Sequence, residues 1–185
     1  MSARLLLCIA ATGALFAFVA SILNSPAARA AEVDCGSITM QFTGAGYAVD
    51  CEAESETLRA NTATGGGQQE FLNATAADES NFLLAIDIRA TGDIYYTHQS
   101  LYNRTKDYFS DMGLKDWHKG SDFAGFEIGE FDGSVRSHAS ECVAFQRSVN
   151  PVRGGYRRVV FGVGCSLQNR AQVYDALKML DAPGD

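Results

Sequence analysis

The chain is 185 residues long, carries a formal net charge of −7 at pH 7 and is 46% hydrophobic. Clustered Lys and Arg supply most of the affinity of nucleic-acid-binding proteins, so this acidic balance argues against general nucleic-acid binding. It argues equally against attachment to an anionic membrane surface through bulk charge.

The first thirty residues have the features of a secretory signal peptide. A short basic start precedes an apolar run over residues 5–23, and Ala28-Arg29-Ala30 forms a cleavage site of the A-x-A type. An uncleaved signal anchor is the alternative, because the run approaches the roughly 20 residues that span a bilayer. Cleavage would leave residues 31–185 as a single globular domain, periplasmic or extracellular, without stable membrane insertion. Removing Arg4 and Arg29 would change the formal charge from −7 to −9.

Four cysteines remain after residue 30, and an even number in an exported chain indicates two disulfides. Three pairings are open, and we predict the two local ones, Cys35 with Cys51 and Cys142 with Cys165. The chain has no C-x-x-C, so neither a thioredoxin-like redox pair nor a zinc ribbon is indicated.

The first half of the chain reads mainly as strands. Residues 37–42 and 47–51 flank a Gly-containing turn and are expected to form a hairpin. The following stretch has a weak pattern that ends in a glycine loop at 65–67, and a short strand is expected over 71–75. Alternating apolar residues over 82–88 predict a half-buried or central strand.

The hydrophobic period changes after Asp93. Apolar and aromatic residues then follow near helical spacing, with Asp93 as an N-cap and Gly113 as a stop, which predicts a long helix over 93–112. A competing interpretation places a hairpin turn at 90–93 and a strand over 94–97, with the helix beginning nearer Ser100.

The second half returns to strands before a final helix. A strand is expected over 123–131 and a hairpin is formed by 141–149 with 157–165. Ser166 can cap a last helix, one face of which carries Val173, Tyr174, Leu177 and Leu180. The predicted fold is therefore α+β: an antiparallel sheet with one long central helix and a C-terminal helix packed on it, held by two disulfides.

The register of the last hairpin follows from its composition. If Val149 lies opposite Arg158, Cys142 falls opposite Cys165, at a spacing that suits a disulfide. The same register places the ring of Phe145 over the bare backbone of Gly162. It also assigns three apolar side chains to the cysteine face as core residues, namely Val159, Phe161 and Val163.

The same hairpin concentrates positive charge. Residues 141–170 contain five arginines and one glutamate, a net charge of +4 on an otherwise acidic chain. Arginine's planar fork matches carboxylate and phosphate groups, and a nearby tyrosine could add stacking. We predict binding of an anionic partner by Arg147, Arg153, Tyr156, Arg157 and Arg158. The alternative is that these charges keep the loop solvated, blunt a sheet edge or pair with acids of the same chain.

Three histidines, His98, His118 and His138, show no metal-ligand spacing, and the chain contains none of the common catalytic motifs. The sequence therefore favours a non-catalytic binding or accessory module without a cofactor or metal, whose partner is an anionic cell-envelope component or protein. Two alternatives stay open. One is a secreted hydrolase that uses His138 or His98 with nearby carboxylates, and the other is a histidine-based metal-binding protein.

Overall fold

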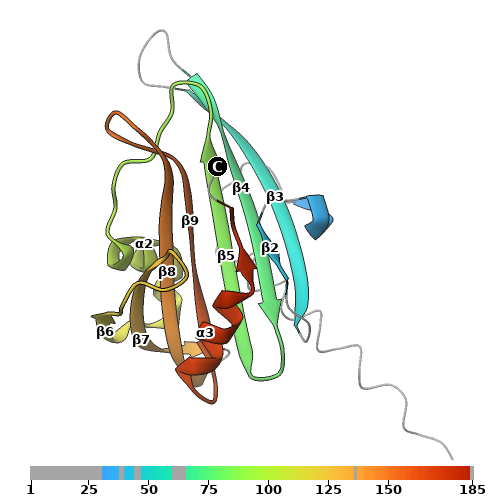
Figure 1. Ribbon diagram of the computed structural model, residues 1–185, viewed down its shortest axis with the longest axis vertical. Coiled ribbons are helices and arrows are strands. Elements are labelled where there is room, and N and C mark those ends of the chain that lie inside the picture. The colour runs from blue at the N-terminus through green and yellow to red at the C-terminus, as the bar shows by residue number, and fades with distance from the viewer. Residues whose placement is uncertain (1–30, 38–39, 44–46, 60–65, 136, 184–185) are drawn as a thin grey trace, which may run out of the picture.

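The computed structural model describes residues 31–37, 40–43, 47–59, 66–135 and 137–183, so the predicted signal peptide over residues 1–30 lies outside the described residues (Figure 1). The described strands are β1 (Ala31–Glu32), β2 (Gln41–Phe42), β3 (Ala48–Arg59), β4 (Gly66–Ala77), β5 (Asn81–Ala90), β6 (Lys115–Lys119), β7 (Glu127–Val135), β8 (His138–Val152), β9 (Gly155–Ser166) and β10 (Leu180–Asp181). The described helical segments are η1 (Cys35–Ser37), α2 (Leu101–Phe109), η2 (Ser110–Met112) and α3 (Arg170–Lys178).

Eight strands form one antiparallel sheet in the order β1-β3-β4-β5-β9-β8-β7-β6. Strands β3 to β5 follow one another as a meander, and β6 to β9 form a second meander. The two meanders meet where β5 pairs with β9, which places the predicted strand over 82–88 near the centre of the sheet. The side chains of β5 are buried on both faces of the sheet, since Leu84, Ile86 and Ile88 belong to one core and Leu83 and Ala85 to the other, and this explains its nearly continuous apolar sequence.

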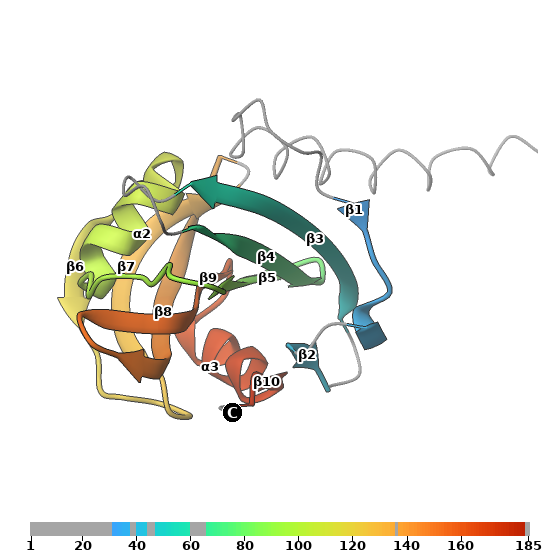
Figure 2. The ribbon, with the colours of Figure 1, turned by 90° about the horizontal axis from the view of Figure 1, so that it is seen from above.

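Each face of the sheet carries its own hydrophobic core. On one face, which we call the α2 face, side chains at alternate positions of β5 and β9, such as Ile86 and Phe161, pack against α2 and η2. On the opposite face, the α3 face, Leu83 and Val160 pack in the core that includes Leu177 of α3. Figure 2 shows the curvature of the sheet, with α3, β10 and β2 together on one side and α2 on the other.

The predicted α+β fold with a long central helix is wrong. The described chain is mainly antiparallel strand, and its two α-helices, α2 and α3, have nine residues each. The segment before α2 is not helical because the backbone of Tyr96 pairs with that of Tyr156, with N–O distances of 2.8 and 2.9 Å. The helix begins at Leu101, and Ser100 caps it by accepting a hydrogen bond from the backbone N–H of Asn103, as in the competing interpretation.

Three further expectations need correction. The predicted N-terminal hairpin does not form, since β2 pairs with β10 whereas β3 pairs with β4. In the stretch of weak pattern after Cys51, the described residues belong to two strands of 12 residues each, β3 up to Arg59 and β4 from Gly66, so that Gly66 and Gly67 of the expected glycine loop lie in β4. The last helix is capped by Asn169, whose side chain accepts from the N–H of Gln172; the hydroxyl of Ser166 instead accepts from two backbone N–H groups of the preceding turn.

The register of the last hairpin and both disulfides are confirmed. Cys142 lies opposite Cys165 and Phe145 opposite Gly162, in the predicted alignment. The two disulfides join Cys35 to Cys51 and Cys142 to Cys165, with Cα–Cα distances of 5.3 and 4.1 Å. Neither α2 nor α3, nor any shorter helix of the described chain, is long and apolar enough to cross a membrane.

Candidate functional site

The β8–β9 hairpin ends in a two-residue turn, Arg153-Gly154, in which Gly154 has a φ of +95° that a side chain would disfavour. The ring of Tyr95 covers this glycine, and a Cβ atom built there would lie 3.2 Å from the Tyr95 hydroxyl oxygen. Tyr95 itself is 44% exposed and Arg153 is exposed. The tip therefore presents one tyrosine and one arginine side by side to solvent.

Arg157 stands next to this tip and is held in place by backbone. Its Nη1 donates to the carbonyl oxygens of Gly92 and Ile94, the latter at 2.9 Å, on the connection between β5 and α2. No carboxylate of the described chain lies within 4.0 Å of either Arg153 or Arg157. Their positive charges are therefore not neutralised by a local ion pair.

Arg158 has a different environment, because its side chain is only 3% exposed and lies on the α3 face. Its Nε and Nη2 donate to the two carboxylate oxygens of Asp87, at 2.9 and 3.0 Å, and its Nη1 donates to the carbonyl of Pro183. Asp87 is fully buried and also accepts from Arg89. This arginine is thus bound within the chain, as the alternative interpretation of the basic residues has it.

Arg147 lies on the same face as Arg158, since Arg147 and Asp87 are both opposite Val160 of the intervening strand. Its guanidinium stacks over the ring of Phe126, 4.7 Å from the centroid. Burial lowers the pKa of Arg147, and the positive charge of Arg158 lowers that pKa further. Arg147 is half-buried and does not belong to the exposed tip.

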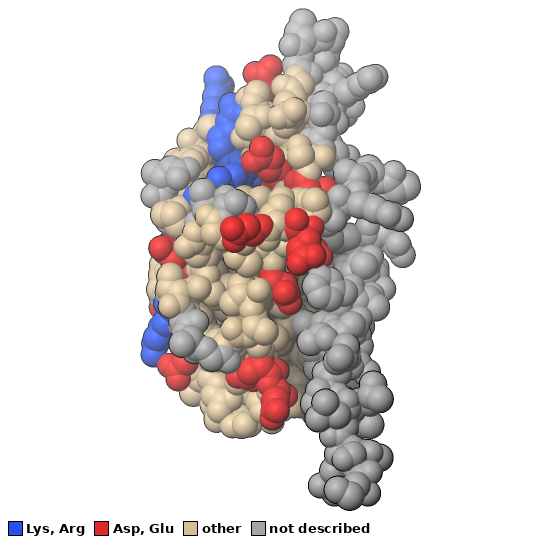
Figure 3. All heavy atoms as spheres, turned by 90° about the vertical axis from the view of Figure 1, so that its right-hand side faces the viewer, with Lys and Arg blue, Asp and Glu red and all other residues tan. Residues whose placement is uncertain are grey.

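The five predicted binding residues therefore divide into two groups. Arg153 and Arg157 lie at the tip, together with the half-buried Tyr156, while Arg147 and Arg158 lie on the α3 face. Figure 3 shows another part of the surface, the side of the molecule that carries β3, where Asp and Glu are widely spread and most visible Lys and Arg gather toward the upper end.

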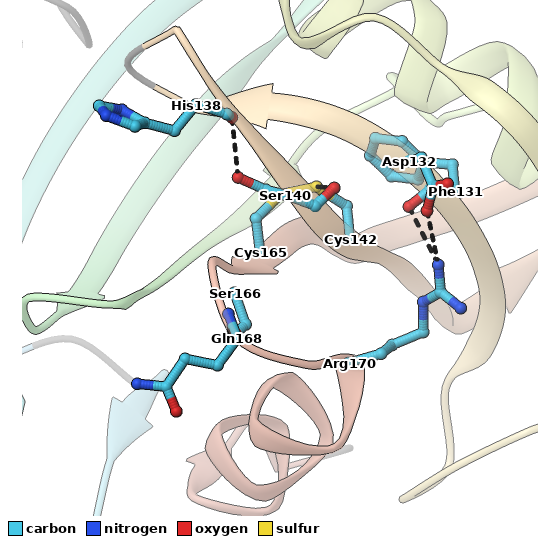
Figure 4. Close-up of a disulfide and its surroundings, with 9 residues drawn as sticks. All are labelled: Phe131, Asp132, His138, Ser140, Cys142, Cys165, Ser166, Gln168 and Arg170. Atoms are coloured by element: carbon cyan, nitrogen blue, oxygen red, sulfur yellow. Dashed lines mark hydrogen bonds and ion pairs between the residues drawn. A yellow bond between two sulfur atoms is a disulfide. The ribbon is translucent and has the colours of Figure 1, made fainter.

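The histidines are placed separately: His98 in the connection before α2, His118 on β6 and His138 at the start of β8, all of them exposed. Figure 4 shows the imidazole of His138 pointing away from Ser140, whose hydroxyl donates to the backbone carbonyl of His138. This is not the nucleophile–base pair that a hydrolase needs. Across the described ranges, no three His, Cys, Asp or Glu side chains are placed to hold a metal ion.

A cleft of about 620 Å³ lies beside the Cys142–Cys165 disulfide, between η2, the adjoining ends of β7 and β8 and the connection from β9 to α3. Its lining includes Asp132 and Glu141, both of which are engaged with Arg170. Asp132 accepts from the guanidinium at 3.1 Å (Figure 4), and Glu141 accepts from the backbone N–H at 2.8 Å. These two carboxylates therefore anchor the start of α3 to the sheet.

A second polar junction lies on the α3 face around Glu130 of β7. Its carboxylate accepts from the hydroxyl of Tyr174 at 2.5 Å and from Arg170 at 3.2 Å, and it lies 3.2 Å from His118. Burial raises the pKa of Tyr174, and the hydrogen bond to Glu130 raises it further. The junction ties α3 and the edge strand β6 to the body of the sheet.

Two residues of the sites described above, Asp87 and Tyr95, were not among the residues predicted from the sequence. Asp87 lies within an otherwise apolar strand, and a buried acid in such a run implies a cationic partner, which Arg89 and Arg158 supply. Tyr95 gives no comparable signal, because its place over the tip depends on the pairing of Tyr96 with β9.

Comparison with known proteins does not place the chain in a family. No protein-family model, no curated protein and no solved structure matches it. Its function is therefore inferred from its own residues.

Proposed function

We propose that the chain is exported to the periplasm or the cell exterior and acts there as a non-catalytic binding or accessory module. The two disulfides support this proposal, because structural disulfides persist in oxidising compartments. The signal-like segment over residues 1–30 supports it as well.

In this proposal the module binds an anionic partner through the tip of the β8–β9 hairpin. The observation that carries this proposal is the state of Arg153 and Arg157, which share a tip with the exposed Tyr95 and have no carboxylate of the described chain within 4.0 Å. The bonds from Arg157 to two backbone carbonyls fix its position without neutralising its charge. Two arginines of one hairpin end without a local counter-charge, one of them fixed in position, suit carboxylate or phosphate groups on a partner.

Charge reversal at the tip tests the proposal. The double variant Arg153→Glu with Arg157→Glu should leave cell-envelope fractions at lower salt than the wild type, because rim charges govern electrostatic attachment. Arg158 is left unchanged, since its substitution would disturb the buried pair with Asp87. The matched control reverses Lys106 and Lys178, which are exposed, and changes the net charge equally.

Equal retention of the tip variant and the wild type would contradict tip binding, as would equal loss in the control. Export has its own measurement, the N-terminus of the protein recovered from the native host. It should begin at Ala31, and recovery of the uncut chain from the cytoplasm would contradict export.

A further inference from the structure

The α3 face shows how this sheet binds a carboxylate. Arg158 presents the edge formed by its Nε and Nη2 atoms to Asp87, so that each nitrogen donates to a different carboxylate oxygen. This side-on arrangement uses two parallel N–H bonds in the guanidinium plane and is a favoured geometry for arginine with carboxylates. It provides an internal reference for the other arginines of the face.

Arg147 has the same Nε–Nη2 edge and lies on the same face of the sheet, where it and Asp87 are both opposite Val160. Its Nε and Nη2 atoms are both shielded from solvent, and neither makes a hydrogen bond within the described chain. Buried donors of a charged group are costly to leave unpaired. The edge that takes Asp87 on Arg158 is therefore the edge that lacks an acceptor on Arg147.

The position of this edge is set before any ligand arrives. The guanidinium of Arg147 stacks over Phe126, which is 2% exposed and packs edge-on against Phe145, with 5.3 Å between the ring centroids. Gly125, the chain neighbour of Phe126, also lies near the guanidinium, since a Cβ atom added there would be 3.5 Å from Nη1 of Arg147, in ordinary van der Waals contact. A donor pair held in this way loses little conformational entropy on binding.

The local charge also favours an anion. Three arginines, Arg89, Arg147 and Arg158, share this face with one fully buried carboxylate, that of Asp87. Asp87 is already bound by Arg89 and Arg158. The negative charge of the nearby, exposed Asp181 raises the pKa of Arg147 and so offsets part of the lowering by burial. Asp181 does not accept a hydrogen bond from Nε or Nη2 of Arg147.

We propose that the Nε–Nη2 edge of Arg147 binds the carboxylate of a small organic acid. A planar group with two oxygens matches the two parallel donors of this edge, and the ring of Phe126 covers a face of the guanidinium and leaves the edge as the part that a ligand can pair with. A single carboxylate carries one negative charge, which one arginine neutralises. This site goes beyond the tip and uses neither Arg153 nor Arg157, so the two proposals can fail separately.

Acetate is the probe for a test with the full chain. Its binding is followed by NMR of carbon-labelled acetate and by the shift in Tm, at an ionic strength held constant with NaCl. The wild type should respond saturably to acetate, and Arg147→Lys should bind it about tenfold more weakly, because lysine keeps the charge but loses the fork. Arg153→Lys, the same change at an exposed position of the same hairpin, should bind acetate as the wild type does.

A second measurement does not require a variant to retain the wild-type fold. The Nε–H resonance of Arg147, assigned in the wild type by its nuclear Overhauser contacts with the ring of Phe126, should move during the acetate titration. The proposal is overturned if the wild type shows no saturable response beyond that to chloride. It is also overturned if Arg147→Lys binds acetate as the wild type does, or if the Nε–H resonance does not move.

Discussion

Removal of the buried carboxylate of Asp87 should be among the most damaging single changes in this protein. Asp87 is 0% exposed and receives N–H bonds from Arg158 at 2.9 and 3.0 Å and from Arg89 at 3.1 and 2.6 Å. Asp87→Asn keeps the shape but removes the negative charge to which Arg158, 3% exposed, is bonded. Breaking one side of a buried ion pair costs about 3–5 kcal/mol, a large share of the roughly 5–15 kcal/mol that stabilises a typical domain.

Urea denaturation at neutral pH measures this loss as a change in the free energy of unfolding. The matched control is Asp175→Asn, because Asp175 also bonds a cation, Lys178 at 2.8 Å, but is 65% exposed. That exposed pair should contribute only about 0–1 kcal/mol. A loss below about 1 kcal/mol in Asp87→Asn, or equal losses in both variants, would refute the assignment of Asp87 as the neutralising group of this face.

Three further predictions concern the hairpin and the polar junction. Replacing Cys142 and Cys165 together by Ser should lower the free energy of unfolding by about 3–4 kcal/mol, and an unchanged denaturation midpoint would contradict this. Gly162→Ala should cost at least about 1–3 kcal/mol, since the new Cβ would lie 2.0 Å from a backbone oxygen; wild-type stability would show that the strands separate easily. The pKa of Tyr174 is higher in the folded state than in the unfolded state. The stability that this difference contributes is therefore fully present below the unfolded pKa of about 10 and is lost as pH rises further. Glu130→Gln should bring the phenolate absorbance change of Tyr174 to lower pH, and an unmoved titration would exclude Glu130 as a cause.

The last hairpin could be predicted in detail because several local requirements agree on one register. A disulfide demands opposed cysteines, and Phe145 fits only where the opposite strand has no side chain, at Gly162. A shift by one residue would break both relations at once. Local chemistry therefore sufficed to position these strands, and the structure confirms the result.

The prediction of a long helix is wrong because pairing with a strand distant in sequence fixes the conformation of the first half of the predicted segment. Residues before Ser100 have helical spacing, but the backbone of Tyr96 bonds to that of Tyr156 and keeps the segment extended. For a similar reason, the sequence does not show which arginines are exposed at the tip and which are bound within the chain. Arg157 and Arg158 are neighbours in sequence, yet alternation along β9 sends them to opposite faces, and only the position of Asp87 shows which one is bound.

The seam between β5 and β9 has a consequence for assembly. The Cys142–Cys165 disulfide closes within the second meander, and Cys35–Cys51 joins η1 to β3 of the first, so neither crosslink spans the seam at which the two meanders meet. We therefore expect that each disulfide can form before the two meanders pair. We also expect the long-range pairing to be the slower step, because its closure entropy receives no help from a covalent bond. The Asp87–Arg158 pair crosses this seam, and it stabilises the join between the two oxidised halves.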